Sequence, residues 1–172
     1  FSVAEMRARA RAYTEAFSAH TDDFEVLFAS KALPVTAAYR LFAEEGLSVD
    51  VASGGELTMA LAAGYSPDRI YMHGNNKTDS ELELASSVGV GHLIIDSFDE
   101  IDRCERVLEK DQDVLIRVTP GIKPSTHSYI QTGQMDSKFG FGLENGSAAE
   151  AIERVLASDR LNLVGLPFHI VS

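Results

Sequence analysis

A lysine follows the first short apolar segment and is the side chain best suited to covalent chemistry. Lys31 comes directly after Ala29 and Ser30, at the end of a segment that reads as a strand. Removing an amine from water favours its neutral form, which attacks an aldehyde to give a Schiff base. Lys31 is therefore a candidate nucleophile toward a carbonyl compound; the alternative is a surface lysine with its head group in water.

Two carboxylates follow the second apolar segment. Asp50 and Glu56 lie on either side of a Ser-Gly-Gly turn, and both are candidate active-site acids near the amine of Lys31. Asp50 has a second interpretation, because a carboxylate can also cap the turn at Gly54–Gly55 that leads into the next helix. The sequence leaves both interpretations open.

The segment HGNNKT, from His73 to Thr78, concentrates donors and acceptors between a strand and a helix. Backbone N–H groups at such a junction can bind an anion, so His73 and Asn75 are candidate ligand-binding residues. The alternative is a capped turn with no ligand.

Two further residues are candidates at the ends of later strands. Arg117 lies inside an apolar segment, and a buried guanidinium needs an anionic partner or a ligand. Asp50 would be that partner if the pair is purely structural. His169 can lie flat against a ring, although a lone histidine near apolar residues is more often part of a core.

The segment from Thr119 to Gly142 is polar and rich in turn residues. Long loops beside a ligand site are often lids. We therefore expect a lid here, with a disordered surface loop as the alternative.

Short apolar segments alternate with segments of helical period, which is typical of βα units and a parallel sheet. We expect strands at Phe24–Ala29, Leu47–Ala52, Arg69–Met72, His92–Ile95, Asp113–Val118 and Leu161–Leu166. We expect helices in the first residues of the chain and at Pro34–Glu45, Gly55–Ala63, Thr78–Val88, Phe98–Glu109 and Ser147–Ala157. Thr78 and Ser147 are expected N-caps, and Gly46, Gly64 and Gly89 are expected just past helix C-termini.

The polar residues favour a barrel over an open doubly wound sheet. An open sheet with a dinucleotide site would carry GxGxxG after its first strand, where this chain reads FASKALP. Polar residues instead follow every strand, and a closed ring brings all such ends to one face. We therefore predict the α/β class and a (β/α)8 TIM-type barrel, of which residues 1–172 form an incomplete domain with about six βα units.

Strand alternation predicts which side chains face the barrel interior. Glu25, Leu27, Ala29 and Lys31 would point inward, and Phe24, Val26 and Phe28 would face helices. By the same rule Arg117 shares the inner face with Asp113 and Leu115, while Val114, Ile116 and Val118 face helices.

Composition excludes several classes of partner. The 172 residues include 26 acidic and 15 basic side chains, a formal net charge of -11. This sign does not suit a nucleic-acid or an anionic membrane surface, and no apolar run reaches the length of a membrane span. The single Cys104 cannot form an internal disulfide, and the five histidines lack metal-ligand spacing. We expect a cytoplasmic protein with no metal and a small-molecule ligand.

Several motifs occur together in one order: FASKAL, SVDVASGGEL, HGNNKT, IIDS, IRVTPG, THSYIQTG, DSKFGF and GLPFHIVS. The chain thereby resembles, over nearly its whole length, the diaminopimelate decarboxylases among the fold type III pyridoxal phosphate enzymes. The resemblance implies a lyase of lysine biosynthesis that decarboxylates meso-2,6-diaminopimelate to L-lysine. It also implies pyridoxal 5'-phosphate as cofactor, a homodimer and a β-rich C-terminal domain.

The resemblance also implies roles for individual residues. Lys31 would hold the cofactor, Asp50, Glu56 and Arg117 would surround the reacting bond, His169 would stack on the cofactor ring, and Ser172 would help bind its phosphate. His73 and Asn75 match a motif at the barrel mouth. Pro167 and Val171 depart from the family pattern GLHxHIGSQ. Two alternatives remain: another fold type III decarboxylase or racemase, and a non-catalytic truncated relative that acts through its dimer face.

Overall fold

The computed structural model describes residues 1–121 and 139–168. Within them, six parallel strands form one sheet in the order β1-β2-β3-β4-β5-β8, and β6 pairs with β7 in a second, two-stranded sheet. The six strands of the large sheet are β1 (Leu27–Ala29), β2 (Ser48–Val51), β3 (Ile70–Met72), β4 (His92–Ile95), β5 (Gln112–Ile116) and β8 (Leu161–Gly165). The short pair is β6 (Val118–Thr119) and β7 (Phe141–Gly142).

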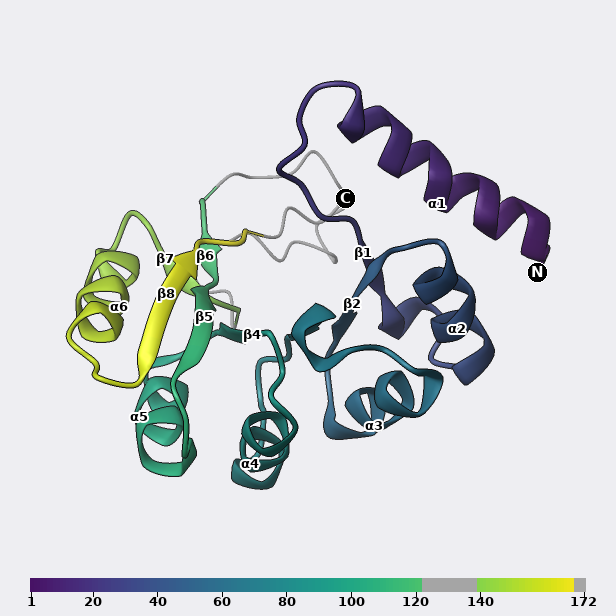
Figure 1. Ribbon diagram of the computed structural model, residues 1–172. Helices are drawn as coiled ribbons and strands as arrows, with labels where there is room; N and C mark the ends of the chain where they lie inside the picture. Colours follow the sequence, from purple (N-terminus) through teal and green to yellow (C-terminus); the bar gives the residue numbers. More distant parts are fainter. Residues whose placement is uncertain (122–138, 169–172) are drawn as a thin grey trace, which may run out of the picture.

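Helices cover only the outer face of the large sheet. Figure 1 shows α2 to α6 in an arc along the outside of the strands, which is the arrangement of a (β/α)8 barrel wall and not of a doubly wound sheet. The predicted α/β class with successive βα units is therefore confirmed. The helices are α1 (Val3–Ser18), α2 (Thr36–Glu44), α3 (Gly54–Ala63), α4 (Asp79–Val88), α5 (Phe98–Val107) and α6 (Ser147–Leu156), and two 3-10 turns are η1 (Ser30–Ala32) and η2 (Pro67–Arg69).

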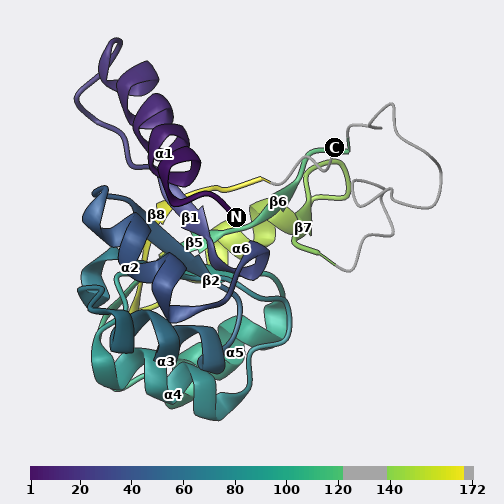
Figure 2. The same ribbon diagram turned by 90° about the vertical axis from the view of Figure 1, so that its right-hand side faces the viewer.

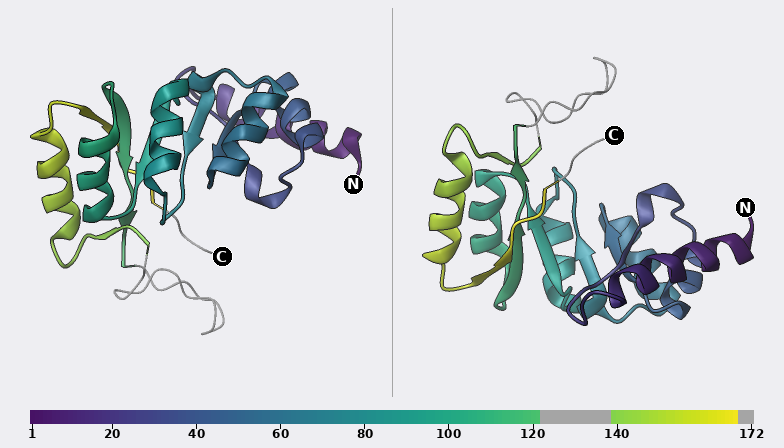
Figure 3. Two further views of the ribbon diagram at one scale, coloured as in Figure 1. Left: turned by 90° about the horizontal axis from the view of Figure 1, so that it is seen from below. Right: turned by 90° about the horizontal axis from the view of Figure 1, so that it is seen from above.

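The N-terminal helix α1 lies outside this arc, against α2 (Figure 2). Arg7 and Arg11 of α1 form ion pairs with Glu45, which follows α2, at 2.5 and 2.6 Å. Figure 3 shows α1 and α6 at opposite ends of the molecule. No helix in the described part of the chain combines the length and the apolar character that crossing a membrane requires.

The core lies between the sheet and the helices. Helices α3 to α6 each bury apolar side chains three or four residues apart, as the helical period of 3.6 requires. These are Leu57 and Ala60 of α3, Leu82 and Ala85 of α4, Ile101 and Cys104 of α5, and Ala151 and Val155 of α6.

The predicted strand alternation is confirmed where burial tests it. Val114, Ile116 and Val118 are buried toward the helices, while Leu115 and Arg117 are half-buried on the inner face. Phe28 of β1 also packs outward, with its ring stacked on that of Phe42 at 4.2 Å between centroids.

Helix termini agree with the predicted caps at most positions. Thr78 caps α4 through a reciprocal pair of hydrogen bonds with Glu81, and Gly64 and Gly89 end α3 and α4 in the left-handed conformation. The predicted N-cap Ser147 is wrong.

The N-cap of α6 is Gly146, and the Ser147 hydroxyl accepts the N–H of Gly142 at 2.8 Å. A second correction concerns Asp50, which does not cap α3. Ser53 caps this helix by accepting the N–H of Glu56, because Ser53 is the residue directly before the helix.

Two predicted strands differ from those observed by more than one residue at an end, and the others agree to within one residue. The first strand starts at Leu27, three residues later than expected, and ends at Ala29. The fifth ends at Ile116, because the carbonyl of Arg117 accepts the N–H of Phe141 at 2.8 Å and the chain then pairs with β7.

Candidate functional site

The segment that carries Lys31 leaves the sheet as a 3-10 turn. Since β1 ends at Ala29, Lys31 follows the strand directly, in η1, and is exposed, so the apolar surroundings expected for it are wrong. Its ammonium makes no hydrogen bond or ion pair with any described residue. The preceding Ser30 is fully buried and donates a hydrogen bond to Glu56 Oε2 at 2.9 Å. The turn is thus anchored beside Lys31, whose amine is left accessible to a ligand.

Glu56 lies in the first turn of α3 and joins two strand ends. Besides the Ser30 hydroxyl, Glu56 Oε2 accepts the N–H of Ala52 at 2.6 Å, directly after β2. Glu56 therefore lies next to the segment of Lys31, as the sequence suggested. Its contacts fix that segment relative to β2.

Asp50 and His73 come together at neighbouring strand ends. Asp50 is paired in register with Tyr71 of β3, and Asp50 Oδ1 lies 3.3 Å from His73 Nδ1. His73 Nε2 is buried and has no hydrogen-bond partner within residues 1–121 and 139–168. An unpaired buried ring nitrogen at the end of a strand is suited to receive a polar group of a ligand.

Arg117 is held by Asp96, and the expected partner Asp50 is paired with His73 instead. Arg117 Nη1 lies 3.2 Å from Asp96 Oδ2, and the Arg117 guanidinium also lies over the ring of Phe139, 4.8 Å from its centroid. Asp96 is nearer because β4, which it follows, is the direct neighbour of β5 in the sheet. Arg117 therefore has a defined orientation on the inner face.

The segment from Phe139 to Phe141 fits closely against Arg117. Gly140 has φ +70°, and a Cβ added there would lie 2.6 Å from the carbonyl oxygen of Arg117. Phe139 O accepts a hydrogen bond from Thr119 Oγ1 at 2.6 Å. A glycine is required at this position because any side chain would push the segment away from Arg117.

A buried ion pair that sequence reasoning did not single out lies between the third and fourth strand ends. Lys77 Nζ lies 2.5 Å from Glu100 Oε1, and both side chains are at most 2% exposed. Burial raises the pKa of Glu100, against the opposing effect of Lys77. The Ser97-x-x-Glu100 pattern marks Glu100 as a residue of a helix start, but no local signal marks Lys77 as its partner.

Glu56, Glu81 and Glu100 share one arrangement. Each lies in the first turn of a helix, accepts a backbone N–H from one or two residues before that helix, and contacts the strand-end segment of the preceding unit. The partners in that segment are Ser30 for Glu56, the N–H of Gly54 for Glu81, and Lys77 for Glu100. We call these contacts the carboxylate ties.

The structure describes only one of the three remaining candidate residues. Asn75 is exposed. His169, Ser172 and most of the expected lid from Thr119 to Gly142 lie outside the described residues.

Cys104 is buried in α5, and burial raises the pKa of its thiol to about 12, so the thiol stays protonated at neutral pH. Among the described residues, no three His, Cys, Asp or Glu side chains form a group that could hold a metal ion.

Comparison with known proteins gives consistent matches over the whole chain. Residues 3–172 match the family model described as "Pyridoxal-dependent decarboxylase, pyridoxal binding domain". The chain is 49% identical to a diaminopimelate decarboxylase of Actinosynnema pretiosum, over 97% of this chain and 37% of that protein. It is 46% identical to the diaminopimelate decarboxylase of Bacillus subtilis, over 100% of this chain and 40% of that protein.

A solved structure agrees with these matches. Diaminopimelate decarboxylase from M. jannaschii in complex with L-lysine superposes with a TM-score of 0.90 at 31% identity, covering 99% of this chain and 41% of that one. The chain thus spans about two fifths of the length of the relatives it matches.

Proposed function

Because the chain belongs to the pyridoxal-dependent decarboxylase family, through that family's pyridoxal binding domain, we propose that its protein decarboxylates meso-2,6-diaminopimelate to L-lysine. The cofactor would be pyridoxal phosphate, and residues 1–172 would be part of the barrel domain that binds it. The similarity to diaminopimelate decarboxylases at 43–49% identity supports this substrate over ornithine or arginine. The observation that carries the proposal is Lys31, an accessible amine directly after β1 within a chain of this family.

The polar groups after the strands fit such a cofactor. Pyridoxal phosphate is an anionic ring with an aldehyde, and Lys31 and Arg117 supply an amine and a fixed cation. His73 Nε2 and Asp96 Oδ1 are buried without hydrogen-bond partners among the described residues, so polar atoms remain for a ligand. The aldehyde and the negative charge of the cofactor thus have counterparts of suitable chemistry among the described residues.

Bound pyridoxal phosphate supplies an electron sink for the carbanion left when CO2 departs. Lys31 would hold the cofactor through its amine, and Ser30, buried against Glu56, would keep the Lys31 backbone in place. Arg117, oriented by Asp96, would stabilise negative charge near the reacting bond. Asp50 would fix the ring of His73. His169 and Ser172 would contact the cofactor ring and phosphate, in keeping with the family pattern.

Further features of the proposal concern assembly and location. We expect a homodimer with a small-molecule amino-acid substrate, as for the family that the sequence resembles. A cytoplasmic location agrees with the single, buried Cys104, which forms no disulfide.

Borohydride reduction tests the role of Lys31. The full-length protein, incubated with pyridoxal phosphate, reduced and digested, should carry the label on the peptide with Lys31, and Lys31→Ala should lose both the label and the visible absorbance. Lys110, an exposed lysine near the opposite ends of the strands, provides a matched control: Lys110→Ala should keep both. A label on Lys77 would contradict the proposal.

Substrate choice is tested separately. Release of CO2 from meso-2,6-diaminopimelate should exceed release from ornithine or arginine by at least about a hundredfold in kcat/KM, since a site built for a polar group rejects a substrate that lacks it. Equal or greater release from ornithine or arginine would overturn the substrate assignment while leaving the cofactor assignment intact.

A further inference from the structure

We propose that the buried Lys77–Glu100 pair is a positioning device that fixes the orientation of Arg117 and of the segment bearing His73. This inference rests on the proposed function, because it assigns Arg117 a place beside the reacting bond. It extends that function by naming residues that act on the site without touching substrate or cofactor.

Lys77 joins two strand-end segments. Its ammonium donates hydrogen bonds to the carbonyl oxygens of Gly74 and Ile94, both at 2.7 Å, and faces Glu100 Oε1 at 2.5 Å. Gly74 lies directly after His73, and Ile94 lies in β4, two residues before Asp96. One buried amine therefore holds the end of β3 against the end of β4 through two hydrogen bonds, with the carboxylate of Glu100 beside it as the counter-charge.

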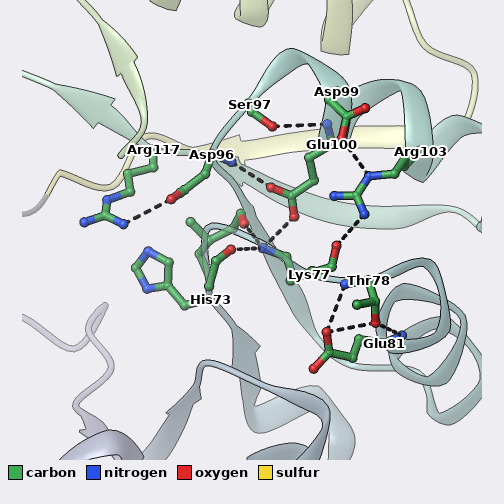
Figure 4. Close-up of polar contacts among 12 residues, drawn as sticks. His73, Lys77, Thr78, Glu81, Asp96, Ser97, Asp99, Glu100, Arg103 and Arg117 are labelled. Carbon is green, nitrogen blue, oxygen red and sulfur yellow. Dashed lines mark hydrogen bonds and ion pairs between the residues drawn. The ribbon is translucent and has the colours of Figure 1, made fainter. Parts of the chain in front are cut away.

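Glu100 extends this connection toward Arg117. Its second oxygen, Oε2, accepts the N–H of Asp96 at 3.0 Å, and Asp96 Oδ2 lies 3.2 Å from Arg117 Nη1. Figure 4 shows Asp96 between Glu100 and Arg117. Glu100 fixes the Asp96 backbone, and the Asp96 side chain is 1% exposed. The Asp96 carboxylate is therefore held in one orientation toward the Arg117 guanidinium.

Stability alone does not account for this pair. Taking two charges out of water is costly, and apolar residues of similar volume often give equal or greater stability. The pair differs from an apolar pair in that its contacts are directional. Through these contacts the pair reaches the segment of His73 on one side. On the other side it reaches Asp96, which pairs with Arg117.

The test uses the full-length protein and a neutral double variant, Lys77→Met with Glu100→Met, so that no buried charge is left unpaired. The readouts are the melting temperature, the Kd for pyridoxal phosphate, kcat, and the pH at which the visible absorbance of the bound cofactor changes. Gln112→Met is the matched control. Gln112 is a buried polar residue whose amide donates to the Val90 carbonyl near the opposite end of β4 and β5.

We expect the double variant to melt within a few degrees of the parent but to lose about tenfold or more in kcat. Its absorbance transition should move in the same direction as that of Arg117→Ala. In the Arg117→Ala background, the double variant should change kcat by a smaller factor than it does in the parent, because part of its effect passes through Arg117. Gln112→Met should leave kcat and the absorbance transition unchanged, whatever it does to melting.

Unchanged kcat and an unchanged absorbance transition in a folded double variant would overturn the inference. The inference would also be overturned if the loss of kcat in the combined variant equalled the product of the losses in the double variant and in Arg117→Ala. If the double variant does not melt cooperatively, Asp96→Asn carries the test: it must displace the absorbance transition, and no displacement overturns the proposal.

Failure of the proposed function gives a different pattern. If the parent protein binds no pyridoxal phosphate, or Arg117→Ala leaves kcat and Kd unchanged, the site assignment itself is wrong. If Arg117→Ala is impaired and the neutral pair is not, only the positioning role is wrong.

Discussion

Gly74 lets the segment after β3 pass close to the segment after β2. Its φ is +108°, and an added Cβ would lie 2.6 Å from the carbonyl oxygen of Ala52. Gly74→Ala should therefore lower the free energy of unfolding by about 3 kcal/mol, from a left-handed backbone that L-residues disfavour plus a steric clash. Urea unfolding of the full-length protein measures this loss.

Gly46→Ala is the matched control for that substitution. Gly46 also has a positive φ, +82°, but an added Cβ would meet nothing within 4 Å. We expect a loss of only about 1–2 kcal/mol, the backbone contribution alone. Equal losses at the two positions would contradict the close approach of Gly74 to Ala52.

Single residues were predictable where position along a strand decides their surroundings. Arg117 and Leu115 share the inner face because side chains alternate along β5, and this follows from the sequence alone. The partner of Arg117 did not follow, because Asp50 and Asp96 are both acidic residues near strand ends. Only the strand order makes Asp96 the neighbour.

The burial of Lys77 was not predictable from its local sequence. Its partner Glu100 lies in the next βα unit, and nothing in HGNNKT indicates whether the amine faces water or the core. The roles of Lys31, Asp50, Glu56 and the other candidate residues stay predictions, and the experiments above test those of Lys31 and Arg117.

At the scale of elements, helix starts were more predictable than strand boundaries. A Ser or Thr followed three residues later by Glu marks the start of α3, α4 and α5, because both side chains satisfy free backbone N–H groups. The bounds of β1 and β5 depend on hydrogen bonds to distant segments. The local sequence does not contain that information.

The docking of α1 on α2 should depend on pH through Glu45. Hydrogen bonds from Arg11 and Arg7 lower the pKa of Glu45 to about 2, from a usual value of 4.5. Since the pKa is lowered on folding, the contribution of this carboxylate is present above pH 4.5 and is lost as the pH falls toward 2. Amide exchange in α1 should therefore accelerate over this range.

Glu45→Gln should produce the same faster exchange in α1 at neutral pH, because the amide cannot form the two ion pairs. Glu5→Gln is the matched control, since Glu5 pairs with Arg9 within α1 and not with another helix. Exchange in α1 that is insensitive to Glu45→Gln would show that the apolar contacts of α1 alone hold it in place.

At the scale of the whole molecule, the parallel sheet with helices on one face follows from the regular alternation of short apolar and helical segments. In the described structure β1 and β8 are the two edges of the large sheet, and Val164 and Leu166 are each 45% exposed.

The 172-residue chain expressed by itself should therefore self-associate. Unpaired edges and exposed apolar side chains favour pairing with a second copy. Light scattering after size-exclusion chromatography should show a mass that rises with concentration, and Val164→Lys should reduce that rise. A monomer at every concentration would contradict the expectation.

The carboxylate ties have a consequence for biosynthesis. Glu56 contacts Ser30, Glu81 contacts Gly54, and Glu100 contacts Lys77, so every tie runs from a later unit back to an earlier one. A ribosome releases the chain from its N-terminus at about 5–20 residues per second. Each glutamate thus leaves the exit tunnel after its partner, and the growing chain can complete its strand-end contacts one unit at a time, in the order of translation.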